Sequence, residues 1–147
     1  MSIEIIGIDH IYLAVSDLHR SERFYDHVMR ILGFRKNTFT NEGDPHIQYF
    51  NRHFGFVLRP ARSANRAHDP LNPGLHHFCF RVEDAATVDA IASGFAQEGL
   101  TCSPPQPYPE YAPDYYATFF SDPDGIRLEV TNYRQERRER FNNWKQA

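Results

Sequence analysis

The sequence contains two copies of one pattern, and an internal repeat constrains the fold of a chain more than any single motif does. The segment GIDHIYLAVSD at 7–17 aligns with GLHHFCFRVED at 74–84, and the two share Gly, His, Val and Asp at matching positions. Further along the chain, FGFVL at 54–58 aligns with DGIRL at 124–128. The spacing between the matches changes slightly, as loop insertions would produce. The chain is therefore predicted to fold as two related modules.

Each copy predicts the same order of elements, namely a strand, a helix and three further strands. The first strands, at about 7–15 and 74–82, show alternation and end near an Asp that suits a helix N-cap. The helices that follow place apolar residues at three- and four-residue steps and stop at Gly33 and Gly99. The later strand-like runs lie at 34–39, 47–50 and 56–59 in the first copy, and at 101–103, 115–121 and 126–131 in the second. The predicted fold class is α+β, built from two βαβββ modules.

The two modules account for most of the chain, whose 147 residues suit a single domain with a substantial core. Module one is predicted at about 5–60 and module two at about 74–133. A polar, proline-bounded linker at 61–73 joins them.

Two other segments lie outside the repeat. The segment 104–114 holds five prolines in eleven positions, so it is predicted to be a semi-rigid loop. The sequence leaves two roles for this loop undecided, namely a lid over a sheet opening and a plain surface connection. The charged tail at 134–147 is predicted to form a helix that packs Phe141 and Trp144 on the body of the protein or on a partner.

Composition excludes several classes of function. The net charge of −3 argues against nucleic acid as the main partner, and the arginines of the tail alternate with glutamates, as on a solvated helix face. No apolar run approaches the roughly 18 residues that a membrane span needs. Two cysteines provide no disulfide framework, and no signal-peptide pattern is present at the start. We therefore expect a cytoplasmic protein that acts on a small molecule.

Three residues suggest a metal site. His10 and His77 occupy the same place in both copies, and equivalent strands of a repeated unit tend to meet about a pseudo-two-fold axis. A pair of hydrogen-bonded histidines at strand starts is the alternative. Glu129 lies in the last strand of the second copy, where a carboxylate is costly to bury unless it is paired or bound to a metal. Two imidazoles and one carboxylate would form a facial triad with open coordination positions.

The segments that carry these residues resemble the motifs of the vicinal oxygen chelate superfamily. This superfamily includes glyoxalase I, methylmalonyl-CoA epimerase, extradiol dioxygenases, fosfomycin-resistance thiol transferases and bleomycin-binding proteins. The resemblance covers about 5–133 and rests on the opening His strand and on the SDPDGIRLEV segment. It implies a cupped mixed sheet around one divalent metal ion held by His10, His77 and Glu129. It also implies a homodimer, with the site in one chain or shared between two. His76 is expected to point to the opposite face of its strand.

The reaction that this resemblance implies depends on the rest of the pocket. The repeat alignment places Arg59 where glyoxalase-like members carry a fourth ligand, and an Arg cannot bind a cation. We therefore predict a three-ligand enzyme, either dioxygenase-like or a lyase or isomerase, that acts on a small anionic substrate. A metal-free, drug-binding protein of the bleomycin-resistance type is the alternative. The metal could be Fe, Mn, Ni, Co or Zn, since mixed nitrogen and oxygen ligands suit all of them.

Strand alternation predicts the remaining side chains of the cavity. The expected substrate-binding residues are Arg59, Tyr12, Cys79 and Phe119. Arg59 would pair with an anionic group of the substrate, while Tyr49 or Tyr115 would donate a hydrogen bond or relay a proton. Packing in the core is the alternative for Tyr12, Tyr49 and Cys79, and a surface position is the alternative for Arg59.

Overall fold

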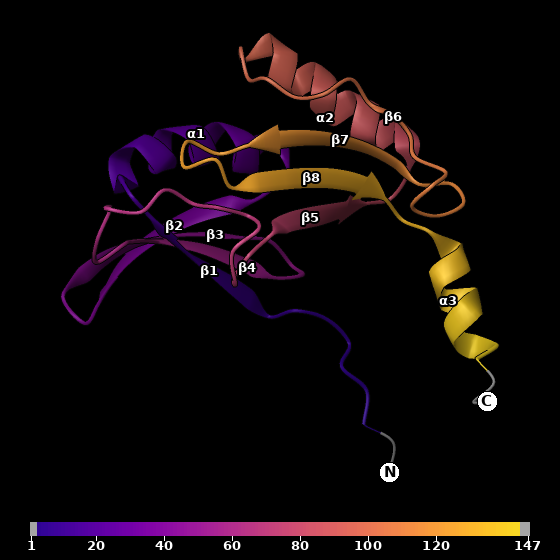
Figure 1. Ribbon diagram of the computed structural model, residues 1–147, viewed down its shortest axis with the longest axis horizontal. Helices are drawn as coiled ribbons and strands as arrows, with labels where there is room; N and C mark the ends of the chain where they lie inside the picture. Colours follow the sequence, from indigo (N-terminus) through magenta and orange to yellow (C-terminus); the bar gives the residue numbers. More distant parts are fainter. Residues whose placement is uncertain (1–2, 145–147) are drawn as a thin grey trace. The chain divides into compact units, whose positions relative to one another are not determined.

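The computed structural model describes residues 3–144. The chain forms two compact units. Unit one consists of Met1–Asp69 with Asp122–Gly125, and unit two consists of Pro70–Ser121 with Ile126–Ala147. Each unit holds one four-stranded mixed sheet and the helix that covers it (Figure 1). The predicted α+β fold of two βαβββ modules is confirmed.

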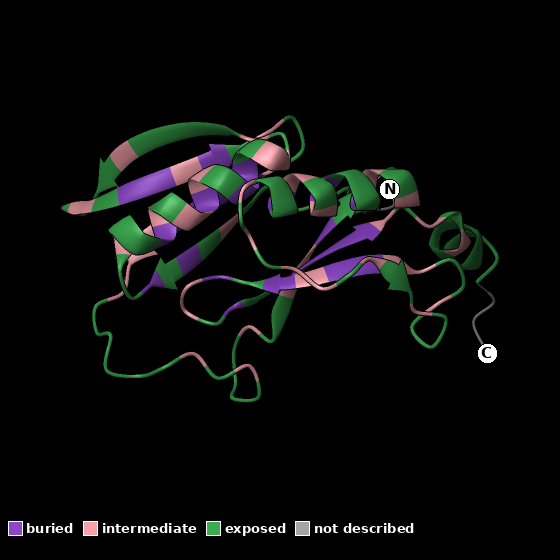
Figure 2. Ribbon diagram, turned by 90° about the horizontal axis from the view of Figure 1, so that it is seen from above, coloured by how far each residue is buried: buried purple, intermediate pink, exposed green. Residues whose placement is uncertain are grey.

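Unit one orders its strands β1-β4-β3-β2, with β1 parallel to β4 and the other neighbours antiparallel. Its elements are β1 (His10–Val15), α1 (Leu18–Ile31), β2 (Arg35–Asn41), β3 (Asp44–Phe50) and β4 (Gly55–Pro60). The Asp17 side chain caps α1 by accepting a 2.9 Å hydrogen bond from the Arg20 backbone N–H. One side of α1 buries Tyr25, Val28 and Met29 against the sheet, while its other side is exposed (Figure 2). The sheet therefore has one helix-covered face and one open face.

Unit two repeats this arrangement with the order β5-β8-β7-β6, in which β5 is parallel to β8. Its elements are β5 (His77–Val82), α2 (Ala85–Gln97), β6 (Gln106–Pro107), β7 (Tyr116–Ser121), β8 (Arg127–Asn132) and α3 (Gln135–Asn142). Asp84 caps α2 by accepting from the Thr87 N–H and hydroxyl at 2.8 and 2.7 Å. Phe95 of α2 is fully buried and meets Phe120 of β7 edge-on at 4.9 Å.

The turn 122–125 belongs to unit one, although it connects β7 to β8. The Tyr25 hydroxyl donates a 2.9 Å hydrogen bond to the buried Asp122 carboxylate, and the Ser16 N–H donates to Asp124 at 2.9 Å. Burial and the Asp122 charge raise the pKa of Tyr25 well above its usual value. Gly125 closes the turn with a φ of 78°, which a residue with a Cβ rarely adopts. Hydrogen bonds from Tyr25 and Ser16 therefore hold the DPDG turn against the rest of unit one.

Two predictions about secondary structure are wrong. The run 101–103 is not a strand, and the fourth strand of unit two is β6, inside the proline-rich segment. A proline is tolerated there because β6 lies at the edge of its sheet. The tail forms the predicted helix, but Phe141 and Trp144 are 73% and 71% exposed, so they do not pack on the body.

None of the helices in the described part of the chain has the length and apolar character needed to cross a membrane.

Candidate metal and substrate site

Unit two contains a pocket of about 660 Å³ on the open face of its sheet. The first residues of β5, the middle of β8 and the segment that leads into β7 all contribute to it. Its lining consists of His76, His77, Tyr111, Tyr115, Phe119, Phe120, Ser121, Arg127, Leu128 and Glu129. Four residues singled out from the sequence, His77, Tyr115, Phe119 and Glu129, thus line one cavity.

Glu129 is the acidic centre of this pocket. It lies in β8 between Cys79 of β5 and Phe119 of β7, and its side chain is only 3% exposed. Its Oε2 lies 3.6 Å from His77 Nε2, and its Oε1 accepts a short hydrogen bond from the Tyr115 hydroxyl. A carboxylate at this depth needs compensation, and an imidazole faces one of its oxygens while a phenol donates to the other.

The spacing of these donor atoms fits a divalent ion. Metal–nitrogen and metal–oxygen bonds of about 2.0–2.2 Å can bridge two donors that lie 3.6 Å apart. Residues 3–144 contain no group of three or more His, Cys, Asp or Glu side chains arranged around one point. Unit two therefore offers two donors, and a third would have to come from elsewhere.

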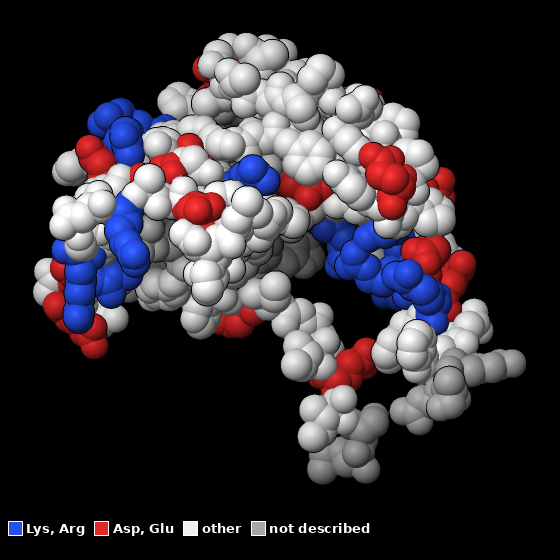
Figure 3. All heavy atoms as spheres, in the orientation of Figure 1, with Lys and Arg blue, Asp and Glu red and all other residues white. Residues whose placement is uncertain are grey.

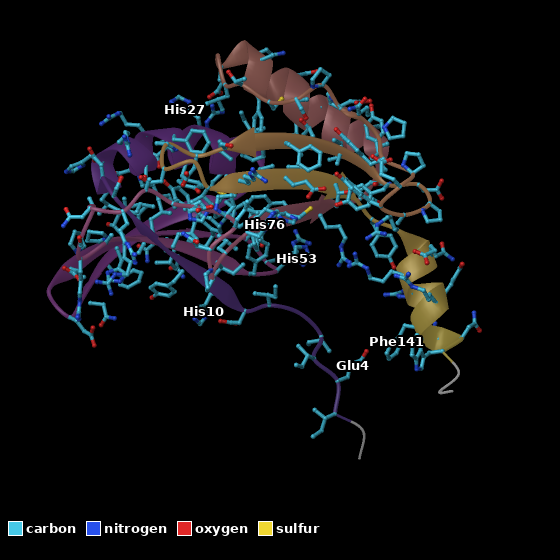
Figure 4. All side chains as sticks on the ribbon, viewed as in Figure 1. Glu4, His10, His27, His53, His76 and Phe141 are labelled. Carbon is cyan, nitrogen blue, oxygen red and sulfur yellow. The ribbon has the colours of Figure 1, made fainter. Side chains whose placement is uncertain are left out.

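His76 also lines the pocket, so the prediction that it points away is wrong. Its Nδ1 lies 2.8 Å from His77 Nδ1, which requires one of the two rings to carry a proton there. Strand alternation does not apply to His76, because β5 begins one residue later. Figure 4 shows His76 at this end of the strand.

Cys79 lies beside the acid but does not line the pocket. Burial, with Glu129 as the next cause, raises the pKa of its thiol from 9.0 to about 12. The group is therefore a neutral thiol at physiological pH. It is a poor nucleophile in this state, since only the thiolate is a good nucleophile. Burial and the hydrogen bond to Glu129 likewise raise the pKa of Tyr115, which keeps this phenol protonated.

The open face of unit one contains a second pocket, of about 590 Å³, which includes His10 and Tyr12. His10 is half-exposed, and its Nδ1 lies 2.7 Å from Asp9 Oδ2. The Tyr12 ring meets the His10 ring edge-on at 5.6 Å. His10 and His77 thus occupy matching places in separate units, each at the first residue of a strand.

Two other predicted residues have structural partners within unit one. Tyr49 is 2% exposed and donates a 2.7 Å hydrogen bond to Asp26 of α1, so it lies on the helix-covered face. Burial and Asp26 raise the pKa of its phenol. Arg59 donates to the Asp44 carboxylate and to the Pro60 carbonyl. The structure therefore brings neither residue to the open face pocket of its unit.

The strand register explains why Arg59 does not lie where the repeat alignment placed it. His10 pairs with Gly55 in the parallel ladder of unit one, and His77 pairs with Arg127 in that of unit two. The residue that matches Glu129 is therefore Val57, and the predicted match with Arg59 is wrong by two positions. Val57 cannot bind a metal, so unit one offers no fourth ligand at this place.

The pocket also contains residues that the sequence analysis did not assign. Arg127 lies two residues before Glu129 on the same face of β8, a spacing that could have identified it. Tyr111 comes from the proline-rich segment, and no periodic signal there could have placed its ring in the lining.

The comparisons with known proteins establish the family. The model of the Glyoxalase/Bleomycin resistance protein/Dioxygenase superfamily matches residues 7–130, so the chain belongs to this superfamily. An uncharacterized protein, YaeR, from Escherichia coli (strain K12) is 30% identical over 132 residues, which cover 84% of this chain and 93% of YaeR.

Solved structures agree at the level of the fold. A glyoxylase/bleomycin resistance protein/dioxygenase domain from Frankia sp. EAN1pec has a TM-score of 0.72 at 25% identity and covers 89% of this chain and 100% of its own. The fosfomycin resistance protein FosX from Listeria monocytogenes, crystallised with Mn(II) and sulfate, has a TM-score of 0.60 at 16% identity. The match covers 92% of this chain and 99% of FosX.

Proposed function

We propose that the protein is a metal-dependent enzyme of this superfamily, in which His77 and Glu129 hold a divalent cation in the unit-two pocket. The buried Glu129 carboxylate carries this proposal, because one of its oxygens faces an imidazole and the other a phenol. His10 would supply a third ligand, from the same chain or from a second copy. The Mn(II) complex of FosX makes manganese the first ion to test, ahead of Fe, Co, Ni and Zn.

The substrate would be a small anionic molecule with an oxygen atom that can bind the metal. A bound divalent ion would supply Lewis-acid activation of that oxygen. Arg127, which lines the same pocket, would pair with the anionic group, a role that the sequence suggested for Arg59. Phe119 and Tyr111 would hold the apolar part of the substrate and exclude water. Whether the reaction is that of a lyase, an isomerase or a dioxygenase depends on the metal and the substrate.

The partner would be a second copy of the chain. Ile3, Ile5 and Ile6 are 92%, 88% and 97% exposed, and such a run of apolar residues favours burial against another surface. β1 and β5 are also edge strands, each with one unpaired side within its own sheet. We expect light scattering to show a dimer, and the double variant Ile5→Ser with Ile6→Ser to weaken it.

Metal analysis tests the proposal. The wild type, Glu129→Gln, His77→Ala and the control His19→Ala are stripped with chelator, loaded with each of the five ions, and desalted. His19 is 89% exposed on α1, so its loss should change nothing. About one ion per chain in the wild type and the control, with loss in the other two, supports the site. If the wild type retains no ion under any loading, the metalloenzyme reading fails, and a metal-free binding protein takes its place.

A further inference from the structure

The Tyr115 hydroxyl has one proton, and Glu129 Oε1 already accepts it. A phenol in this state cannot donate to a substrate without first releasing the carboxylate. The second oxygen of Glu129 remains turned toward His77 Nε2, at 3.6 Å. The phenol thus divides the carboxylate into a bonded oxygen and an oxygen directed at the imidazole.

The tyrosine ring is held on two sides. The Arg134 guanidinium carbon lies 4.8 Å from the ring centroid, within the range of a cation–π contact. The Tyr111 ring meets it edge-on at 5.4 Å and itself stacks on Tyr108 at 5.3 Å. Arg134 is the residue before α3, and Figure 3 shows the Lys and Arg atoms that gather over this helix. The tail and the proline-rich segment therefore both contact the ring.

The backbone of Tyr115 is fixed as well. Its carbonyl accepts a 2.7 Å hydrogen bond from the Tyr108 N–H, and its own N–H donates to the Ala112 carbonyl at 3.2 Å. The next residue, Tyr116, donates its N–H to the Asn132 side chain at 3.0 Å. These bonds hold the start of β7 against the end of β8, so the hydroxyl has little freedom to leave Glu129.

We infer that Tyr115 is a positioning residue, which orients Glu129 so that Oε2 alone is presented as a metal ligand, and that Arg134 holds the Tyr115 ring in place. The inference rests on the proposed metal site and gives Tyr115 a role different from proton transfer to a substrate. Hydrogen-bonded partners of metal ligands typically account for about 10–100-fold in metal affinity.

The test uses Co(II), whose visible absorption reports the geometry of its ligands. Tyr115→Phe removes only the hydroxyl, and Tyr116→Phe is the matched control, because the Tyr116 hydroxyl bonds to Asp89 at 2.7 Å. We expect Tyr115→Phe to bind Co(II) about 10–100-fold more weakly, with an altered visible spectrum and an unchanged circular dichroism spectrum. Arg134→Gln should weaken binding about two- to fivefold. Tyr116→Phe should match the wild type.

The outcomes separate the two claims. Wild-type affinity and spectrum in Tyr115→Phe would overturn the inference and leave the metal site intact. If Tyr115→Phe does not fold, Arg134→Gln decides, and wild-type behaviour of that variant overturns the inference. A wild type that binds no Co(II) would overturn the proposed metal site and the inference together.

Discussion

The two units share one topology and differ on their open faces. Val57 in β4 and Glu129 in β8 occupy the same register position in the central part of their sheets, yet one is apolar and the other acidic. Tyr12 and Cys79 are likewise matched, each two residues after the first His of its unit. One scaffold therefore appears twice, and the buried acid is present in only one copy at this place.

The helix-covered faces differ far less. Phe56 and Leu128 occupy matching positions, and both are buried, at 0% and 1% exposure. Each faces a helix whose N-cap is an Asp. The comparison indicates that the apolar face maintains the fold of each unit, while the open face is free to carry chemistry.

Matched truncations on the covered faces should produce the largest losses of stability. Phe56→Ala and Leu128→Ala remove equivalent buried side chains and leave cavities, which costs about 3–5 kcal/mol for Phe and about 2–5 kcal/mol for Leu. Urea denaturation of metal-free protein measures both. If one variant loses less than about 1 kcal/mol, the covered faces are not equivalent, and this half of the comparison fails.

The docked turn of unit one provides the next largest effect. Tyr25→Phe removes the donor to the buried Asp122 carboxylate, which should cost about 1–3 kcal/mol of unfolding free energy. The control is Tyr116→Phe, because its hydroxyl bonds to the exposed carboxylate of Asp89 and should matter little. Equal stability of the two variants, measured by urea denaturation, would show that the turn does not stabilise unit one.

The thiol beside the acid gives unit two a pH dependence. The pKa of Cys79 rises from 9.0 to about 12 on folding, so the folded state keeps the proton longer than the unfolded state. Its stabilising contribution is complete below about pH 9 and is lost as the pH rises toward 12. In chelator, the wild type should lose about 1 kcal/mol more than Cys79→Ala between pH 8 and pH 10. Parallel loss in both proteins would contradict this assignment.

The tail should have the smallest effect. Phe141 and Trp144 are exposed, so changing both to Ser should alter the unfolding free energy by less than about 0.5 kcal/mol. Thermal unfolding and light scattering measure the outcome. A dissociated dimer in the double variant would instead place these rings at a contact with a second copy.

The repeat made the order of strands and helices predictable, because both helices are amphipathic and each is preceded by an Asp that caps it. The register was harder to predict, for a physical reason. The alignment matched Gly55 with Gly125, two glycines that serve different purposes. Gly125 adopts a positive φ in a turn, whereas Gly55 lies in β4, where a Cβ would approach Gln48 and His10 to 3.4 and 3.5 Å. The match therefore shifted Arg59 onto the position of Glu129.

Part of the candidate site could also be read from the sequence. His77 and Glu129 were identified by symmetry and by the cost of a buried carboxylate, and the structure places them together. Tyr49 was assigned to the cavity because the repeat alignment matched it with Phe119. That match is wrong by one residue, since the register partner of Tyr49 is Phe56, which faces α1. Tyr111 lies on an irregular segment whose position depends on ring contacts with Tyr108 and Tyr115, which no local pattern encodes.

The central claim is that the open face of unit two, and not the matching face of unit one, holds the metal at a carboxylate. A crystal of Mn(II)-loaded protein, with anomalous scattering recorded for the metal, tests it most directly. We expect the main anomalous peak about 2.0–2.3 Å from His77 Nε2 and from one oxygen of Glu129. A main peak in the open-face pocket of unit one, away from Glu129, would contradict this claim. The absence of any peak in fully loaded crystals would contradict it as well.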